Sequence, residues 1–571
     1  MKRALLLAGL LALALPASAF AHAALLRTKP SASRVVNKPP QQVSLTYSEP
    51  VEPRFAIISV TNATAKQVTA GSPRRAADNP DRLVVPLERV PAGWYLVFWR
   101  VISIDGHPVR GAFTFAVGPN QGPPPQFVIP SLSETATTPK LLITRWIVFL
   151  SMMAALGLFT LRTVIARPLS RVVRGASLRA VAIAFWVSLA IAILSTLVYS
   201  LLTTAQFALR SAFDLSAIFP LLRQSAFSRG YLDLTFVLLL FGAAAAVALW
   251  VDRPERTQRS VAELLAQGGA FTAGLAGLVI PGVVGHAGQA SPRDVALMLD
   301  SLHLLAGSVW IGGLIGLIVL SQSMPASLRV RALSFVVPRF SRVAFVSVML
   351  LLASGIWAAV LHLPTLATLW DTSYGLAIVA KIGLLGTAML LASVNLLRNR
   401  PRLAASRTRP DLASGAAGLL RRLVTGEAVL IVWAIFAAAI LTSLAPPSKA
   451  LAQAKGASAR VGPGPVRQVV HKQGYRLSFA VDPNRAAIPN DFSVQISRDG
   501  KPVTRARVVA RFEMLDMEMG NLAYTLPERQ PGVFARSAPA LVMVGHWGLD
   551  FEITPPGGQP FDVLLLDKAG G

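Results

Sequence analysis

Eight long apolar segments between residues 141 and 445 constrain this chain more than any other feature. Each is close to the ~20 residues that a helix needs to cross the hydrocarbon core of a bilayer. The whole chain of 571 residues is 53% hydrophobic and only 15% charged, which is typical of a polytopic membrane protein. The predicted spans are 141–166, 180–205, 231–251, 262–282, 294–320, 336–361, 374–397 and 423–445.

The arginines between these segments indicate the orientation in the membrane. If the residues before 141 lie outside, the first, third, fifth and seventh connections face the cytoplasm. Eighteen arginines lie in or beside those connections, against four in the opposite ones. Because cytoplasmic loops carry such an excess, both ends of the chain are expected outside. The same bias explains the formal net charge of +27, so we expect the lipid bilayer, and no nucleic acid, as a partner.

The first 21 residues have the pattern of a secretory signal. A charged start is followed by an apolar run over residues 4–15 and by the small-residue motif Ala19-Phe20-Ala21. Cleavage after that motif would make His22 the first residue of the mature chain. Its α-amine and ring Nδ1 could then chelate one metal ion, and such nitrogen ligands favour Cu(II). The chain contains no cysteine, which excludes thiolate ligands and disulfides.

The regions on either side of the apolar segments predict small β domains. Residues 22–118 contain strand-like runs separated by turn residues, and residues 468–571 contain runs that alternate with period two around an Asp499-Gly500 hairpin turn. Linkers rich in proline, glycine and small residues are expected over 119–140 and 446–467. The runs lie at 43–47, 55–60, 82–86, 93–99 and 111–117, and at 476–481, 492–496, 506–512 and 548–553.

These patterns predict a multi-domain membrane protein. A β-sandwich or barrel (22–118) precedes a central all-α bundle of about eight transmembrane helices (141–445), and a small β-sandwich (468–571) follows it.

A first candidate metal site combines His22 with Asp105 and His107. These two lie in Ser103-Ile-Asp-Gly-His-Pro-Val-Arg-Gly111, where residues two apart point to the same side of an extended segment. With the amine and Nδ1 of His22, they would complete a four-ligand nitrogen and oxygen site for Cu(II). The alternative is that Asp105-Gly106 is only a hairpin turn with an exposed His107.

Ionisable residues within the apolar segments form a second candidate site. Each costs roughly 2.5–3.5 kcal/mol on insertion scales, so such residues are usually functional. His286 and His303 could form an entry pair for copper near the outer face, or His303 could simply hydrogen-bond a neighbouring helix. We expect Lys381 and Glu427 to pair with one another as a structural or coupling ion pair.

A methionine cluster forms the third candidate site. Met514, Met517 and Met519 lie within six residues, and thioethers suit Cu(I). Met543 or His546 could complete the set. The alternative is that these methionines only fill the core of the C-terminal domain.

Residues 22–118 resemble the CopC-type periplasmic copper-binding domain. The resemblance implies a cupredoxin-like or Ig-like fold and a Cu(II) site formed by His22, Asp105 and His107. Some members also hold Cu(I) with a methionine-rich loop, but residues 22–151 contain no methionine, so that site is not expected here. The matching segments are His22-Ala-Ala-Leu-Leu, Pro30-Ser31, Leu45-Thr-Tyr-Ser-Glu-Pro-Val51, Gly93-Trp-Tyr and Ser103 to Gly111.

Residues 141–445 resemble the CopD family. The order of the two domains, CopC-like and then CopD-like, also matches that of fused copper-uptake proteins. The matching residues are Gly285-His286-Ala287, Asp300-Ser-Leu-His303, Trp310-Ile-Gly-Gly-Leu314, Arg339-Phe-Ser341, Gly355, Lys381 and Glu427. Residues 468–571 are similar, more weakly, to the YtkA-like or FixH-like β domains found beside copper proteins.

Together these features predict a copper-binding protein of the bacterial inner membrane, with both β domains on the periplasmic side. It would capture Cu(II) there and pass copper into the cytoplasm, with copper ions and periplasmic copper chaperones as partners and no enzymatic activity. Three alternatives stay open: a periplasmic copper buffer without transport, a haem or quinone electron-transfer protein that uses His286 and His303, and an oxidase that uses the N-terminal histidine.

Overall fold

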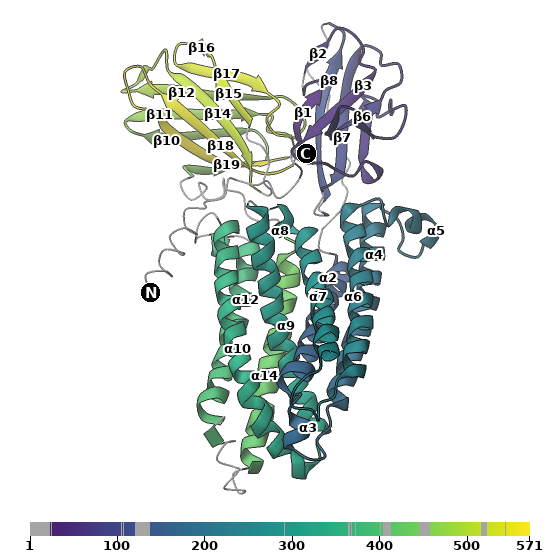
Figure 1. The fold of residues 1–571 in the computed structure, drawn as a ribbon. Helices are drawn as coiled ribbons and strands as arrows, with labels where there is room; N and C mark the ends of the chain where they lie inside the picture. Colours follow the sequence, from purple (N-terminus) through teal and green to yellow (C-terminus); the bar gives the residue numbers. More distant parts are fainter. Residues whose placement is uncertain are drawn as a thin grey trace. The chain divides into compact units, whose positions relative to one another are not determined.

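The computed structural model describes two compact units (Figure 1). One contains the long helices between residues 138 and 444, and the other contains the β regions that precede and follow them. The described residues are 23, 25–32, 34–103, 106, 108–119, 138–289, 292–363, 366, 368–371, 373–399, 401–402, 413–444, 457–515, 522–542 and 544–570.

The N-terminal β region is a sandwich of two four-stranded sheets, as predicted. The sheets have the orders β1-β3-β6-β5 and β2-β8-β7-β4, and side chains from both fill one core. Tyr47 and Trp99, one from each sheet, meet edge to face with ring centroids 5.7 Å apart. The strands are β1 (Leu25–Lys29), β2 (Val35–Val36), β3 (Gln42–Tyr47), β4 (Ile57–Asn62), β5 (Arg74–Ala76), β6 (Asn79–Pro86), β7 (Gly93–Ile102) and β8 (Pro108–Val117).

The five predicted strand runs of this region all fall within these strands or overlap them. The strands that sequence patterns missed, β1, β2 and β5, are short and mostly exposed, so they carry no clear alternation of apolar residues. By contrast, β7 is buried over almost its whole length, because its hydrophobic run from Trp94 to Trp99 lies in the interior of its sheet.

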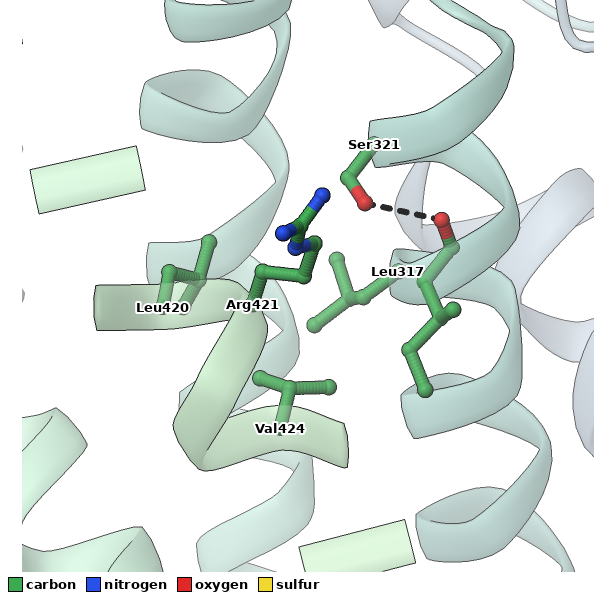
Figure 2. A pocket seen from close by; sticks show the side chains of 6 residues that line it. Leu317, Ser321, Leu420, Arg421 and Val424 are labelled. Atoms are coloured by element: carbon green, nitrogen blue, oxygen red, sulfur yellow. Dashed lines mark hydrogen bonds between the residues drawn. The ribbon is translucent and has the colours of Figure 1, made fainter. Parts of the chain in front are cut away.

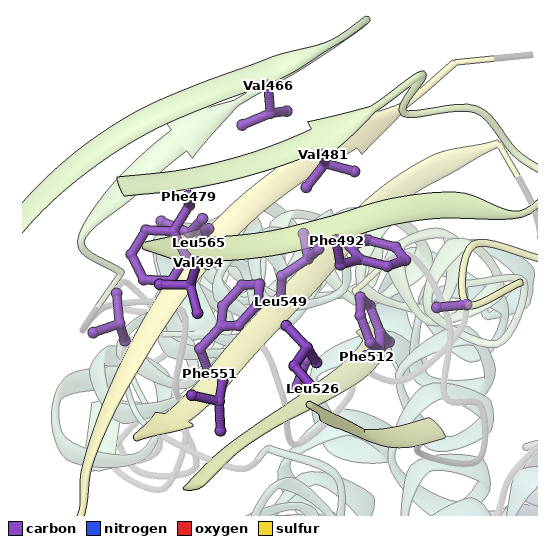
Figure 3. Close-up of a cluster of buried hydrophobic side chains, with 14 of the residues drawn as sticks. Val466, Phe479, Val481, Phe492, Val494, Phe512, Leu526, Leu549, Phe551 and Leu565 are labelled. Atoms are coloured by element: carbon purple, nitrogen blue, oxygen red, sulfur yellow. The ribbon is translucent and has the colours of Figure 1, made fainter. Parts of the chain in front are cut away.

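The C-terminal β region is also built from two sheets, with a shared core of aliphatic and aromatic side chains (Figure 3). The sheet orders are β10-β11-β12-β17-β16, with β13 paired to β12, and β15-β14-β18-β19-β9. The strands are β9 (Ala459–Val461), β10 (Val466–Lys472), β11 (Tyr475–Asp482), β12 (Asn490–Arg498), β13 (Lys501–Pro502), β14 (Arg507–Met514), β15 (Leu522–Leu526), β16 (Glu528–Gln530), β17 (Val533–Ala538), β18 (Gly545–Thr554) and β19 (Phe561–Ala569).

The predicted hairpin turn at Asp499-Gly500 is confirmed. Both residues have positive φ angles, 51° and 76°, and the turn pairs Arg498 with Lys501. The predicted linker over 446–467 needs correction, because β9 lies inside it and pairs in parallel with β19. The run around Ala459 is too short to show a strand period in the sequence, although it belongs to the C-terminal sheet.

The described part of the helical unit contains eight helices long and apolar enough to cross a membrane, as predicted. Two of them begin about ten residues earlier than the apolar segments suggest: α10 at Ala326 and α14 at Ala413. The arginines at these starts lower the hydropathy without interrupting the helix. The long helices are α2 (Pro139–Thr160), α4 (Arg179–Phe207), α6 (Ala226–Val251), α7 (Val261–Val283), α9 (Arg293–Ser323), α10 (Ala326–His362), α12 (Ser373–Val394) and α14 (Ala413–Leu441).

Shorter elements connect or extend these helices. They are α3 (Leu169–Val172), α5 (Leu215–Ile218), α8 (His286–Gln289), α11 (Thr368–Asp371), the π-helical turns η2 (Leu161–Ile165) and η4 (Asn395–Asn399), and the 3₁₀ turns η1 (Pro53–Phe55) and η3 (Phe219–Leu221).

Helices α2 and α9 approach so closely that only glycine fits at their contact. A Cβ added at Gly157 would lie 1.9 Å from the Ser308 carbonyl oxygen, and one added at Gly312 would lie 2.4 Å from the Gly157 Cα. Small residues let transmembrane helices pack backbone to backbone in this way. This contact fixes the position of α9 within the bundle.

A buried ion network ties the end of α2 to the connection between α6 and α7. Asp252 accepts hydrogen bonds from Arg162 at 2.9 Å and from Arg167 at 2.8 Å, and Arg167 also contacts Glu263 at 3.1 Å. Glu263 forms a capping box with Ser260 at the start of α7. The paired charges explain how several ionisable side chains are buried at this end of the bundle.

We expect Gly312→Ala to destabilise the helical unit, because the new methyl group overlaps α2 and overpacking typically costs about 1–3 kcal/mol. Gly383→Ala on α12 is the matched control, since nothing lies within 4 Å of a Cβ at Gly383. Thermal unfolding of both variants in detergent measures the difference. Equal melting temperatures for the two variants would contradict the close contact.

Candidate metal centres

The start of the N-terminal domain lies at one end of the sandwich. Ala23 is only 1% exposed and belongs to the sandwich core. Leu25, the first residue of β1, pairs with Tyr47, the last residue of β3. The first described residue is therefore held beside the end of β3.

The connection between β7 and β8 lies at the same end. The N–H of Glu52, in the segment that follows β3, donates to the Ile102 carbonyl oxygen at 3.2 Å, and Ile102 pairs with Pro108 across the hairpin. Gly106 has a φ of 83°, and its N–H donates to the Ser103 carbonyl oxygen at 3.0 Å. The tight turn expected at this glycine is thus present.

The predicted ligands His22, Asp105 and His107 lie outside the described residues. Their described neighbours, Ala23 and the residues on either side of the β7–β8 turn, lie at one end of the sandwich, which is the arrangement that a shared site needs. Glu49 follows β3 by two residues and adds a half-buried carboxylate at this end. The sequence contained a signal for it, because Glu49 lies inside the Tyr47-Ser-Glu-Pro segment of the family motif.

In the helical unit, His303 of α9 has both ring nitrogens in polar contacts. Its Nδ1 lies 2.9 Å from Ser354 Oγ of α10, and the Ser354 hydroxyl donates to the Leu350 carbonyl oxygen at 2.6 Å. A hydroxyl has one hydrogen, so Ser354 Oγ accepts the bond from His303 Nδ1–H. A neutral His303 consequently carries its lone pair on Nε2.

Lys381 of α12 faces that lone pair. Its Nζ lies 3.4 Å from His303 Nε2, and it interacts electrostatically with Asp300, one turn before His303 on α9. Gly282 of α7 makes room for this carboxylate, because a Cβ there would lie 2.7 Å from Asp300 Oδ2. The structure thus gathers a carboxylate, an imidazole and an ammonium group from α9 and α12 inside the bundle.

The predicted pair of Lys381 with Glu427 is not formed; Lys381 contacts His303 instead. Glu427 of α14 is 3% exposed, and its Oε1 has no hydrogen-bond partner among the described residues. Lys381 lies eight residues after the start of α12, and Glu427 lies fourteen residues before the end of α14. At 1.5 Å per residue, Glu427 is therefore about 9 Å deeper in the bundle than Lys381. This difference in depth explains why the two charges do not meet.

The second predicted membrane histidine, His286, is the first residue of α8, four residues after Gly282. Helix α8 packs against α7 and α9. The backbone of His286 therefore lies near the end of α7 at which Gly282 contacts Asp300. Its side chain lies outside the described part of the structure.

A small pocket lies at the other end of α9 (Figure 2). In it the Arg421 side chain of α14 extends toward Ser321, whose hydroxyl donates to the Ile318 carbonyl oxygen at 2.8 Å. The lining residues are Leu317, Ile318, Ser321, Leu420, Arg421 and Val424. Sequence patterns gave no indication of this pocket, because it depends on how α9 and α14 pack.

The C-terminal methionine cluster is only partly described. Met514, the last residue of β14, is 2% exposed, belongs to the domain core and pairs with Trp547. His546, the neighbour of Trp547, is exposed. Because successive strand residues point to opposite faces, Met514 and His546 do not share a face, and a site that uses both side chains is not formed. Met517 and Met519 lie outside the described residues, as does Met543.

A buried carboxylate that the sequence did not indicate lies on β19. Asp567 Oδ1 accepts a hydrogen bond from Asn484 Nδ2 at 2.8 Å, whereas Oδ2 is buried without a hydrogen-bond partner among the described residues. Burial raises the pKa of Asp567 to about 6. Removal of this carboxyl group from water thus makes it a weaker acid.

The fold and these clusters define a multi-pass membrane protein that carries two β domains and buries titratable groups within its helices. The CopC domain model matches residues 25–118, and the model for copper resistance protein D matches residues 335–441. The chain belongs to the family of fused CopC–CopD copper proteins, which confirms the resemblances seen for its first two domains.

Individual relatives agree with this assignment. The copper transport protein CutJ of Bacillus subtilis (strain 168) is 26% identical over 542 residues, which cover 93% of each chain. Protein YobA of Escherichia coli (strain K12) is 35% identical over 101 residues, 18% of this chain and 82% of that one. The crystal structure of CopC from Methylosinus trichosporium OB3b is 33% identical and covers 19% of this chain and 99% of that one; its TM-score of 0.16 supports no structural argument.

The match to copper resistance protein D covers part of the helical unit. It includes most of α10 and all of α12 and α14, and therefore Lys381 and Glu427, whereas Asp300 and His303 precede it. The resemblance of the C-terminal domain to YtkA-like or FixH-like domains stays a prediction.

Asp567 is expected to make the C-terminal domain less stable as the pH rises. Its pKa is raised from the ordinary 3.8 to about 6 in the folded chain. The folded state therefore binds the proton more tightly than the unfolded state, and stability falls between about pH 4 and pH 6. We expect Asp567→Asn to remove this part of the pH dependence. Hydrogen exchange of peptides from β18 and β19, corrected for the intrinsic exchange rate, measures the stability of the domain at each pH.

Asp562→Asn is the matched control, since Asp562 is an exposed residue of the same strand. It should leave the pH dependence as in the unmodified chain. An unchanged pH dependence in Asp567→Asn would show that the buried carboxyl does not titrate as described.

Proposed function

We propose that this protein captures Cu(II) outside the cytoplasmic membrane and passes copper inward through its helical unit. The observation that carries the proposal is the gathering of His303, Asp300 and Lys381 inside the bundle of a CopC–CopD chain. The relative that covers 93% of this chain is named a copper transport protein, which supports transport over storage alone.

Capture would take place at the end of the N-terminal sandwich where β1 begins and the β7–β8 turn lies. The α-amine and Nδ1 of His22, a ring nitrogen of His107 and a carboxylate oxygen of Asp105 form the proposed ligand set. Such a set suits Cu(II), which prefers tetragonal nitrogen and oxygen coordination. The positive φ of Gly106 supports the proposal, because it allows the tight turn between Asp105 and His107.

Passage would begin at His303, ten residues and about 15 Å from the start of α9. An imidazole nitrogen and the carboxylate of Asp300 are ligands that copper accepts. From there copper would follow the contact between α9 and α14. This contact continues past the level of Glu427 to the pocket at Ser321 and Arg421. A monovalent cation that moves inward gains about 2.3 kcal/mol for each 100 mV of membrane potential.

The orientation follows from the arginine bias between the helices. With eight crossings and the arginine-rich connections inside, both β domains would lie on the periplasmic side of a bacterial inner membrane. The capture site and the start of α9 would then lie on the side from which copper arrives.

For the capture site, we expect His107→Ala to lose bound Cu(II), because a ring nitrogen is removed from a four-ligand set. Electron paramagnetic resonance of the copper-loaded full chain should lose the nitrogen coupling of that ligand, and the affinity for Cu(II) should fall about tenfold or more, as for a lost bond of at least 1.4 kcal/mol. His471→Ala, an exposed histidine on β10, is the control. N-terminal sequencing that places the mature start elsewhere than His22 would contradict this site.

For passage, we expect His303→Ala to abolish copper entry while leaving Cu(II) capture intact. Cells that produce the protein are grown with copper, and cytoplasmic copper is measured after fractionation. The His303→Ala cells should match cells without the protein, and His471→Ala cells should match the unmodified protein. Normal cytoplasmic copper in His303→Ala cells would rule out this route. Copper protection without any uptake by the unmodified protein would favour the buffering alternative.

A further inference from the structure

We propose that the ammonium group of Lys381 occupies the copper position at His303, and that copper binds there only when this ammonium withdraws. The inference rests on the proposed role of His303 in copper passage. It explains what keeps the site closed in the absence of metal. Lys381 would compete with copper for the imidazole of His303 and the carboxylate of Asp300.

The hydrogen bonds around His303 identify the atom for which they compete. Ser354 Oγ uses its one hydrogen for the Leu350 carbonyl oxygen and accepts from His303 Nδ1–H. Nε2 is therefore the ring atom left with a lone pair, and it is the atom that would bind a metal ion. Lys381 Nζ lies 3.4 Å from this same Nε2, so the lone pair is directed at an ammonium group.

The second ligand group is shared as well. Asp300 lies one turn from His303 on α9 and interacts electrostatically with Lys381. The ammonium group thus contacts the imidazole nitrogen and interacts electrostatically with the carboxylate, and both groups are donors that a copper ion could use. Because like charges repel strongly in a low dielectric, the position beside His303 Nε2 holds either the ammonium group or the metal ion.

The surroundings allow Lys381 to leave but keep the ligands in place. Gly282 faces Asp300 Oδ2, and a Cβ at Gly355 would lie 3.4 Å from His303 Cε1, so α7 and α10 hold the carboxylate and the ring closely. Lys381 reaches the site on a flexible four-carbon chain from α12, whose rotamers can change without moving a helix. The site therefore opens by motion of one side chain.

The test measures Cu(I) affinity of the full chain in detergent, with ascorbate present and a coloured Cu(I) chelator as competitor. The membrane contribution is the difference between each protein and the same protein carrying His303→Ala, which removes the signal of the two β domains. We expect Lys381→Met to raise the His303-dependent affinity about tenfold or more, as for removal of a charge-assisted hydrogen bond that competes with the metal. Lys381→Arg, which keeps the charge, should give no increase.

Lys140→Met is the matched control, since Lys140 is exposed at the start of α2. Lys381→Gln is a second neutral variant in case Lys381→Met elutes as an aggregate, and it should also raise the affinity. His303-dependent copper of unchanged or weaker affinity in both neutral variants would overturn the competition while leaving His303 as a ligand. Absence of His303-dependent copper in every protein, neutral variants included, would overturn both this inference and the proposed passage site.

Discussion

The absence of water within a bilayer governs how this chain arranges its polar groups. A polar or charged side chain in the hydrocarbon region needs its partner within the protein. Two sets of contacts in the helical unit show how such partners are supplied. His303 of α9 contacts Lys381 of α12 and Ser354 of α10, and Asp252 pairs with two arginines where α6 ends. In the second set both oxygens of Asp252 are paired with arginines, as expected of a structural element, whereas the first set contains a nitrogen lone pair that a metal could use.

Helix α9 connects these packing and binding features. The middle of α9 lies against α2 through the contact of Gly312 with Gly157. This contact leaves no room for a methyl group and so fixes the position of α9. Its first half carries Asp300 and His303, and its last turns line the pocket at Ser321. A helix held this firmly suits a site whose ligands should stay in place while a flexible lysine moves.

Sequence reasoning succeeded where the signal is local. Apolar length predicted eight membrane helices, and period-two runs predicted the longer strands of both β domains. It failed where the answer depends on packing between elements. The charges of Lys381 and Glu427 suggested a pair, but their depths in the bundle differ, and Lys381 meets His303. The sequence leaves Met514 open as a ligand or a core residue, and its place in the sheet directs it into the core. Asp567 carried no sequence signal, because its burial results from the partner strand.

The charge at the membrane site argues for the kind of ion that it can accept. An ionised Asp300 would contribute one negative charge, and the ammonium group of Lys381, which interacts with it electrostatically, would balance that charge. A monovalent copper ion in place of the ammonium group leaves that balance unchanged. A divalent ion would add an uncompensated charge inside the bundle, where the penalty for an unpaired charge is several kcal/mol. The two proposed metal sites are therefore expected to differ in oxidation state: the nitrogen and oxygen ligands proposed for capture suit Cu(II), whereas the charge balance of the buried site favours Cu(I). Transfer from one to the other would need one electron from an external reductant.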